Sequence, residues 1–163
     1  MSLEYSIERV DKDNLFMFDN MVFYRKHGRE KSETELKDKQ DFNLYYKSYC
    51  DALEIPTFYV FAAKLEEKFV GYIFINYLPK IGVQANNGHL YIEDLWTHPN
   101  YRRMGIAESL MKKAEELAKE KDIHGLRLGV NSTNDAAIAL YEKCGYKSMF
   151  GTGMTMQKEV LSE

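Results

Sequence analysis

The chain has 163 residues, of which 45% are hydrophobic and 29% are charged, a balance typical of a single folded domain. The formal net charge of −3 argues against broad binding of nucleic acid or of anionic membranes, because both require a surplus of basic residues. No apolar run approaches the ~20 residues of a membrane span, and the N-terminal segment lacks the apolar core of a signal peptide. The composition therefore favours a cytoplasmic protein with neither kind of partner.

The first third of the chain is predicted to be mainly helical after one short strand. The strand is expected at Tyr5–Val10 and a helix at about Lys12–Lys26. A second helix is predicted over Ser32–Ala52. Ser32 with Glu35 three residues later forms the pattern of a capping box, in which each side chain satisfies a backbone N–H of the other.

The middle of the chain changes to β-branched and aromatic residues, which are typical of buried strands. Two strands are predicted at Thr57–Leu65 and Phe69–Tyr77, joined as a hairpin by three polar residues. A polar loop follows at residues 81–89, and a further strand is expected at Leu90–Thr97. These three strands should form the centre of the sheet.

The last third contains the clearest helix, at Ala107–Lys121, with one apolar stripe and charges elsewhere. A short strand is predicted at residues 125–130 and a second helix at residues 135–144, which Gly145 terminates. The remaining residues are predicted to form a hairpin of two strands, Tyr146–Phe150 and Met154–Lys158.

This order predicts an α/β (α+β) domain. It contains about four helices packed on a mixed, mostly antiparallel sheet of about seven strands. The strand at Leu90–Thr97, the following helix and the next strand form a β-α-β unit, whose two strands should be parallel.

The cysteines and histidines give no sign of a metal site. Cys50 and Cys144 have no metal-ligand or redox spacing, so both are expected to be reduced thiols. The four histidines are dispersed, and His89 and His98 flank one predicted strand, where surface or loop positions are expected.

One stretch, RRMGIA at residues 102–107, carries more chemical information than its neighbours. It follows a strand and opens the long helix, whose free N–H groups and dipole favour an anion. Gly105 would let the backbone approach an oxyanion, and Arg102 and Arg103 would add charged donors. A diphosphate site and a simple helix start both fit this stretch taken alone.

Together with a second motif, however, the stretch resembles the GCN5-related N-acetyltransferases. Residues 102–107 match that family's motif [QR]-x-x-G-x-[GA]. A second family motif, N-x-x-A-x-x-L-Y-x-x-x-G-[FY], is matched in the expected order by Asn134, Ala137, Leu140, Tyr141, Gly145 and Tyr146. The resemblance covers most of the chain from about Phe58 onward.

The resemblance implies the GNAT fold, in which acetyl-CoA binds in a cleft where the two central strands splay apart, without a metal. The backbone of Leu95, Trp96 and Thr97 would pair with the pantetheine arm like an added strand. The amides of residues 102–107 would hold the pyrophosphate. The implied cofactor-binding residues are Leu95, Trp96, Thr97, Arg102, Arg103, Met104, Gly105, Ile106, Ala107, Asn134, Ala137 and Tyr141.

Asn134 and Ala137 would serve the pantetheine arm. The resemblance implies that Asn134 hydrogen-bonds this arm or nearby backbone, and that Ala137 leaves room beside the cofactor. Tyr141 would point at the thioester sulfur and is the candidate general acid, although a buried aromatic at a helix position is the alternative.

Glu93 is the candidate general base, because it interrupts an apolar strand where we expect partial shielding from water. The alternative is a solvated or ion-paired carboxylate. Asp94 should point to the opposite face, since side chains alternate along a strand, and is expected to be structural.

The sequence thus predicts a single N-acetyltransferase domain over residues 1–163, with a variable acceptor side at about 1–55 and an acetyl-CoA-binding core at about 56–163. The acceptor would be the primary amine of a small polyamine-, diamine- or amino-acid-like molecule. The alternatives are a protein N-terminus or lysine as acceptor, and a non-catalytic acyl-CoA-binding regulator. A homodimer is expected. Acceptor specificity should come from the loop at 81–88 and from aromatics of the first helices: Phe16, Phe18, Phe23, Tyr24, Phe42, Tyr45, Tyr46 and Tyr49.

Overall fold

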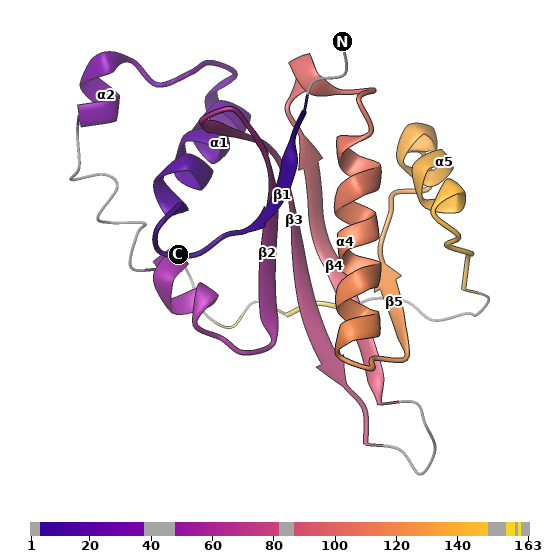
Figure 1. Ribbon diagram of the computed structural model, residues 1–163. Coiled ribbons are helices and arrows are strands. Elements are labelled where there is room, and N and C mark those ends of the chain that lie inside the picture. Colours follow the sequence, from indigo (N-terminus) through magenta and orange to yellow (C-terminus); the bar gives the residue numbers. More distant parts are fainter. Residues whose placement is uncertain (1–3, 38–47, 82–86, 150–155, 159, 161–163) are drawn as a thin grey trace.

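The computed structural model describes residues 4–37, 48–81, 87–149, 156–158 and 160 (Figure 1). These residues form one mixed sheet flanked by helices. In chain order the elements are β1 (Ser6–Arg9), α1 (Leu15–His27), α2 (Glu33–Lys37), a helical stretch at 48–53, β2 (Phe58–Leu65), β3 (Lys68–Pro79), β4 (Gly88–Thr97), the 3₁₀ turn η1 (Pro99–Tyr101), α4 (Ile106–Glu120), β5 (Gly125–Leu128) and α5 (Asp135–Lys143). No helix in the described ranges is long and apolar enough to cross a membrane.

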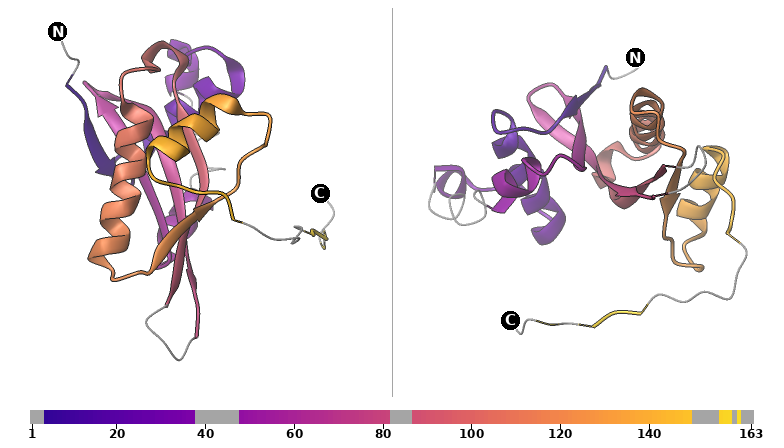
Figure 2. Two further views of the ribbon diagram at one scale, coloured as in Figure 1. Left: turned by 90° about the vertical axis from the view of Figure 1, so that its right-hand side faces the viewer. Right: turned by 90° about the horizontal axis from the view of Figure 1, so that it is seen from below.

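The strands lie in the sheet in the same order as in the chain, from β1 to β5. The first four pair antiparallel, and β4 pairs with β5 in parallel around the crossover helix α4, as the β-α-β prediction required. In Figure 2, α1 and α4 lie on opposite faces of this sheet, and α5 lies beside α4. The result is a three-layer arrangement in which β3 is the central strand and β4 lies between β3 and the edge strand β5.

Each face of the sheet has its own apolar core. Alternate residues of β2 and β3 point to opposite faces, so Ile73 and Ile75 pack with Leu110 of α4, whereas Val60 and Tyr72 pack with Phe18 of α1. Leu110, Ile73 and Ile75 are fully buried. At ~25 cal/mol per Å² of apolar surface, such side chains each contribute roughly 1.5–3 kcal/mol to folding.

Local chemistry explains where the helices begin and end. The capping box is confirmed, because Ser32 N–H donates to Glu35 Oε2 at 2.8 Å and Glu35 N–H donates to Ser32 Oγ at 3.2 Å. α1 ends at Gly28, whose φ of +69° places it in the left-handed region. Asn14 Oδ1 accepts from the Asp11 N–H and organises the turn before α1, so this helix begins three residues later than predicted.

Two predictions about the number of elements are corrected. The structure describes a sheet of five strands rather than about seven, and five α-helical segments rather than about four. The predicted final hairpin accounts for the missing strands: residues 146–149 and 156–158 adopt no strand, and the segment between them lies outside the described residues. Within the predicted helix 32–52, helical structure covers Glu33–Lys37 and residues 48–53, and the part between them is likewise not described.

A β-bulge interrupts β4 halfway along its length. On the side of β3, Ile92 pairs with Ile75 and Asp94 pairs with Phe74, so Glu93 is an extra residue without a partner on β3. On the other side, β4 pairs with β5 only from His89 to Ile92, although β4 continues to Thr97. β4 and the edge strand β5 therefore separate at the bulge.

Candidate active site

The edge of β4 beyond the bulge is the first part of the candidate site. Leu95, Trp96 and Thr97 pair with Ile73, Tyr72 and Gly71 of β3 on one side, and β5 does not accompany them on the other. Leu95 packs toward α4 and Trp96 toward α1, so this segment separates the two cores. It offers an extended backbone edge of the kind that binds a linear ligand as an added strand.

The loop after β4 forms the second part of the site. Arg103 and Gly105 have φ values of +64° and +80°, and such left-handed residues turn successive N–H groups toward a common point, an anion-binding arrangement. The hydrogen-bond ladder of α4 begins at Ser109, whose backbone N–H donates to the Gly105 carbonyl at 2.9 Å. The amides of Ile106 and Ala107 precede this ladder and point out of the helix N-terminus.

The side chains of this loop divide between solvent and core. Arg102 and Arg103 are exposed, and Arg102 Nε donates to the Thr97 carbonyl at 3.2 Å. Ile106 is buried, and Met104 packs against the same core, so both anchor the loop to the protein interior. Apolar side chains therefore anchor the loop, whereas Arg102 and Arg103 are exposed to solvent.

A residue that the sequence did not single out holds this loop in place. Tyr5 Oη donates to the Gly105 carbonyl at 3.1 Å and shares a hydrogen bond of 2.6 Å with Ser109 Oγ. Tyr5 lies just before the edge strand β1, about a hundred positions away in sequence. Only the tertiary fold brings it to the start of α4.

The second sequence motif forms α5, which stands beside the diverging strands. Asn134 is the N-cap of this helix, and its Oδ1 accepts from the Ala137 N–H at 3.2 Å. This is the contact with nearby backbone that was one of the two expectations for Asn134. Ala137 itself is half-buried.

Tyr141 of α5 is half-buried and packs against the α4-side core. Burial raises the pKa of its phenol, and the negative charges of Asp94 and of a Cys144 thiolate act in the same direction. The hydroxyl therefore stays protonated throughout the neutral range. The influence of Asp94 also shows that Tyr141 lies within electrostatic reach of the bulged part of β4.

The bulge changes the expected directions of Glu93 and Asp94. Asn76 Nδ2 donates to Glu93 Oε1 at 3.3 Å, and Tyr72 Oη donates to Asp94 Oδ2 at 2.8 Å. Because Tyr72 and Asn76 share one face of β3, both carboxylates lie on that face, and the prediction that they point to opposite faces is wrong. Glu93 is also exposed rather than shielded.

Asp94 belongs to a charged cluster that sequence reasoning missed. Arg25 Nη1 donates to both Asp94 Oδ2 and Tyr72 Oη, and the guanidinium lies over the rings of Tyr72 and Trp96. Burial and Asp94 raise the pKa of Tyr72, so its hydroxyl remains a donor. The expected structural role of Asp94 is consistent with this cluster, but its partners come from α1 and β3.

His98 lies where α1 meets the loop that follows β4. It lies in the loop after β4, one of the two positions expected for it, but it is only 5% exposed and so is not at the surface. Its Nδ1 accepts from the Asn100 N–H at 3.1 Å, its ring lies 3.9 Å from that of Tyr24, and its Nε2 is 4.0 Å from Glu30 Oε1. Burial lowers the pKa of His98. The neutral ring thus joins α1 to the loop that leads to Gly105.

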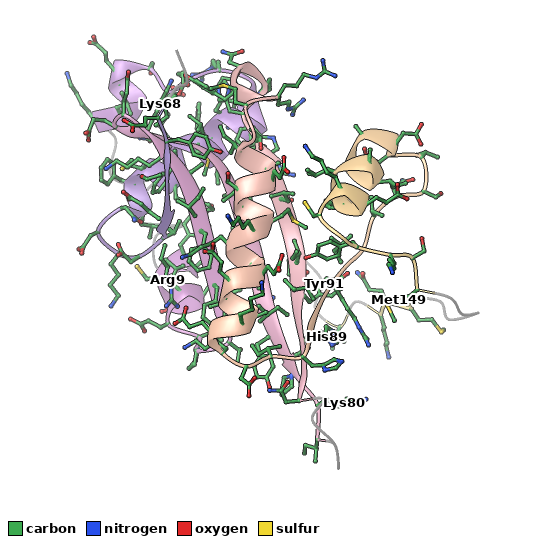
Figure 3. All side chains as sticks on the ribbon, turned by 45° about the vertical axis from the view of Figure 1, so that its right-hand side comes forward. Arg9, Lys68, Lys80, His89, Tyr91 and Met149 are labelled. Atoms are coloured by element: carbon green, nitrogen blue, oxygen red, sulfur yellow. The ribbon has the colours of Figure 1, made fainter. Side chains whose placement is uncertain are left out.

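His89 lies at the other end of β4, away from this loop. It lines a cavity of about 540 Å³ together with Lys80 and Met149 (Figure 3). Part of the predicted specificity loop, residues 82–86, and three of the predicted aromatics, Phe42, Tyr45 and Tyr46, lie outside the described residues. Of the other aromatics, Phe18 is buried in the α1 core and Phe16 is 53% exposed.

Comparison with known proteins identifies the family. The profile of the acetyltransferase (GNAT) family matches residues 21–146, more than half of the chain. The chain belongs to this family. The match includes β4, the loop, α4 and α5, so the GNAT motifs are the same segments that form the site.

Curated GNAT relatives match in parts of their length. A thialysine N-epsilon-acetyltransferase of Caenorhabditis elegans is 44% identical over 61 residues, which are 37% of this chain and 38% of that protein. Streptothricin acetyltransferase A of Bacillus subtilis is 33% identical over 100 residues, which are 61% of this chain and 57% of that protein. The match therefore spans less than two thirds of the length of either relative.

A solved GNAT structure supports the fold over nearly the whole chain. An aminoglycoside N-acetyltransferase in complex with CoA superposes with a TM-score of 0.68 at 12% identity, covering 94% of this chain and 99% of that one. At this identity the likeness concerns the fold alone.

Proposed function

We propose that this chain transfers an acetyl group from acetyl-CoA to the primary amine of a small molecule. One observation carries the proposal: the edge of β4 that β5 leaves at Ile92 leads directly into a loop whose amides converge at the N-terminus of α4. This combination provides an extended edge for a linear arm and an anion site for a pyrophosphate. The family match adds that proteins with these segments are acetyltransferases.

On the donor side, acetyl-CoA would supply the activated thioester. The backbone of Leu95, Trp96 and Thr97 would bind the pantetheine arm, and the amides from Arg103 to Ala107 would bind the pyrophosphate. Arg102 and Arg103 would add charge, and Asn134 would fix the start of α5 with Ala137 facing the arm.

On the catalytic side, two groups divide the proton transfers. Glu93 would accept a proton from the acceptor ammonium, directly or through water, because an alkyl amine with a pKa near 10 is otherwise protonated at neutral pH. Tyr141 would donate its proton to the leaving thiolate, since its raised pKa keeps the phenol protonated. The amine would attack directly, without a covalent intermediate on the protein.

The acceptor class follows from the α1-side face of the bulge. Glu93 lies there with an exposed carboxylate that can attract a small cation, whereas Arg25 already pairs with Asp94 and covers the rings of Tyr72 and Trp96. The two curated relatives compared above are named for thialysine and streptothricin, which favours a small-molecule acceptor. A polyamine-, diamine- or amino-acid-like amine fits this chemistry.

The deciding experiment incubates a panel of acceptor amines with acetyl-CoA and measures the free thiol of CoA that each reaction releases. The panel should contain diamines, polyamines, lysine-like amino acids, aminoglycosides and peptides with free N-termini or lysines. We expect turnover with a small amine, and a Tyr141→Phe variant as the matched negative control. Faster turnover with a peptide than with any small amine would indicate that the acceptor is a protein. Binding of CoA without turnover of any acceptor would indicate a non-catalytic regulator.

A further inference from the structure

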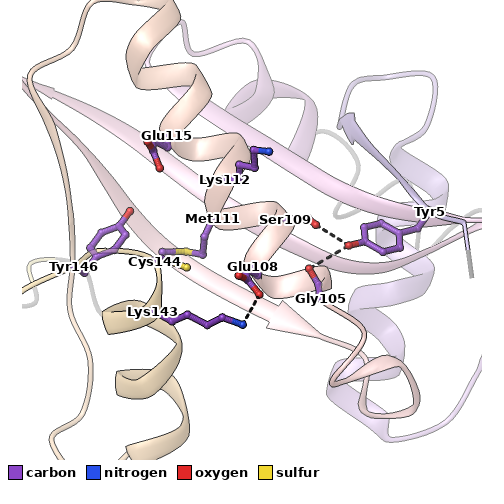
Figure 4. Close-up of a pocket in the computed structure, with 10 residues that line it drawn as sticks. All are labelled: Tyr5, Gly105, Glu108, Ser109, Met111, Lys112, Glu115, Lys143, Cys144 and Tyr146. Atoms are coloured by element: carbon purple, nitrogen blue, oxygen red, sulfur yellow. Dashed lines mark hydrogen bonds and ion pairs between the residues drawn. The ribbon is translucent and has the colours of Figure 1, made fainter. Parts of the chain in front are cut away.

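The two faces of the sheet carry hollows of different chemistry. On the α4 side, the lining of a groove between α4 and α5 includes several charged side chains, among them Lys112 and Lys143 (Figure 4). On the α1 side, a pocket of about 170 Å³ is formed by α1, the helical stretch at 48–53 and strands β2 and β3. The lining of this α1-side pocket is mainly apolar: Val10, Leu15, Phe18, Ser48, Tyr49, Ala52, Leu53, Phe58, Val60 and Phe74.

Aromatic rings form much of the wall of the α1-side pocket. The ring centroid of Phe74 lies 5.8 Å from that of Phe18 and 5.7 Å from that of Phe58. The ring of Tyr49 meets Phe18 edge-on, with 5.9 Å between the centroids. Apolar cavities of about 150 Å³ stay dry and bind a benzene ring. The volume and the walls of this pocket therefore suit one phenyl-sized or branched alkyl group.

Phe74 connects the α1-side pocket with the bulge of β4. It is only half-buried, although it lies in the middle of β3, so its ring is not covered on every side. Phe74 pairs with Asp94, and Asn76, two residues further along the same face of β3, donates to Glu93. Residues two apart on one strand are separated by ~7 Å. The carboxylate of Glu93 and the pocket are thus neighbours on one face of the sheet.

The charges beside the pocket favour a ligand with one positive group. At the bulge, Arg25 and Tyr72 hold the carboxylate of Asp94, whereas that of Glu93 is exposed. A second ammonium inside the pocket would lose its hydration without gaining an ion pair, because the described residues that line the pocket include no charged side chain. An apolar group would instead gain free energy in proportion to the surface that it buries.

We propose that the α1-side pocket binds the apolar part of the acceptor, a primary amine whose aryl or branched alkyl group is joined to the nitrogen by a short carbon chain. The inference rests on the proposed function, because it needs an acceptor amine at Glu93. The chain of the acceptor crosses the ~7 Å to Phe74, and its apolar group packs against Phe18, Tyr49 and Phe58. Among small amines, those with a second ammonium at the far end are the poorer acceptors.

The test compares the turnover of matched amines by the full chain with acetyl-CoA, measured as the free thiol of CoA that is released. Pentylamine and 1,4-diaminobutane have the same number of non-hydrogen atoms and differ in whether the far end is a methyl group or an ammonium. We expect kcat/KM to be about tenfold higher for pentylamine. From ethylamine to 2-phenylethylamine, kcat/KM should rise about 10- to 100-fold, the effect of burying one large apolar side chain.

Two pocket variants and one control assign this preference to the pocket. Ala52→Phe fills the pocket, so kcat/KM for 2-phenylethylamine should fall about tenfold while that for ethylamine stays unchanged. Leu53→Ala enlarges the pocket, so an ethylamine with a naphthyl group should improve relative to 2-phenylethylamine. Ile55→Phe is the matched control: Ile55 follows the same helical stretch, is 49% exposed and does not line the pocket, so the preference should not change. Normal turnover of ethylamine shows that each variant is folded.

The outcomes separate this inference from the proposed function. Turnover of 1,4-diaminobutane equal to or faster than that of pentylamine would overturn the pocket site and leave the proposed function intact. Equal losses of the preference in Ala52→Phe and Ile55→Phe would also overturn it, because they would indicate an effect on the whole segment rather than on the pocket. Absence of turnover with every amine would overturn the proposed function together with the pocket site.

Discussion

The α4 side and the α1 side of the sheet are built in different ways. On the α4 side, the candidate donor site uses backbone groups of one continuous segment, from Leu95 to Ala107, and a helix cap at Asn134. On the α1 side, the charged cluster uses side chains of Arg25, Tyr72 and Asp94 from three separate elements, and Arg25 and Asp94 are 69 positions apart in sequence. A site made of consecutive backbone leaves a motif in the sequence, whereas a site made of distant side chains leaves none.

The largest expected effect concerns Tyr141, which packs against the α4-side core. Tyr141→Phe should lower kcat by about 10²- to 10⁴-fold, the usual contribution of a general acid, and leave the affinity for CoA unchanged. Steady-state kinetics with calorimetry measures both. Because burial raises the pKa of Tyr141, loss of its proton should not limit the rate of the unaltered enzyme at neutral pH.

A suitable control for this variant is Tyr77→Phe. Tyr77 Oη donates to the Asn87 carbonyl near the base of the β3–β4 hairpin, so its loss should affect stability rather than kcat. A Tyr141→Phe enzyme with normal kcat would exclude the acid role.

The second-largest effect is expected for Gly105→Val on the α4 side. A valine at φ +80° is strained, and a shifted loop would lose contacts to the pyrophosphate at about 1.5–3 kcal/mol each. We expect CoA affinity to fall by roughly 10²- to 10⁴-fold for two such contacts. Gly28→Val is the matched control, because Gly28 is also left-handed, at φ +69°, but terminates α1. Equal CoA affinity in the two variants would contradict the anion site.

Glu93→Gln tests the α1 side of the bulge. We expect kcat/KM for the amine to fall about 10- to 100-fold, a modest value for a general base that water can partly replace. The loss should be greatest at low pH, where most of the amine is protonated and needs a base. A pH–rate profile of the same shape as that of the unaltered enzyme would exclude Glu93 as the base, and Glu67→Gln in the β2–β3 turn serves as the control.

Arg25→Met should weaken the binding of the acceptor amine but not the binding of CoA. Removal of the guanidinium leaves Asp94 without its cation and frees the rings of Tyr72 and Trp96. We expect the KM for the amine to rise about fivefold, corresponding to ~1 kcal/mol for a partly exposed pair, with CoA affinity unchanged. Arg29→Met, which breaks the ion pair of Arg29 with Glu35 of α2, should leave both constants unaltered. A change in CoA affinity in Arg25→Met would show that the two sides are not independent.

The smallest effect is expected for His98 and concerns stability. This residue joins α1 to the loop that follows β4. Burial lowers its pKa in the folded chain, with Lys68 and Arg102 adding to this and Glu30 opposing it. The unfolded chain therefore binds the proton more tightly, so stability present above about pH 6.5 is lost as the pH falls. Thermal unfolding between pH 7.5 and 5.5 should show a steeper decline for the unaltered protein than for His98→Gln, with His124→Gln as control. Parallel declines in all three would exclude the effect.

The sequence predicted much of the fold because the core elements follow their periodicities closely. α4 begins and ends within one residue of its expected range, and β2 to β5 lie within two residues of theirs. The capping box of Ser32 and Glu35 was also predicted, since it depends only on neighbours in the chain. The sheet of about seven strands did not hold for the described residues, and the helix expected over residues 32–52 is confirmed only at Glu33–Lys37 and residues 48–52.

The errors at the candidate site have one physical cause. A β-bulge is decided by pairing with another strand, so the alternation of Glu93 and Asp94 could not be read from β4 alone. The same applies to His98, whose burial depends on Tyr24 of α1, and to Tyr5, which reaches Gly105 from the other edge of the sheet.

By itself, the sequence determined most of the elements, the parallel β4–α4–β5 unit and the loop at residues 102–107 that opens α4, because these depend on local periodicity and on residues next to each other in the chain. The tertiary structure alone decided where β4 and β5 separate, which face the two carboxylates share, and which lysines line the groove between α4 and α5. These features depend on strand register and on helices that meet across the sheet, and no local pattern specifies either.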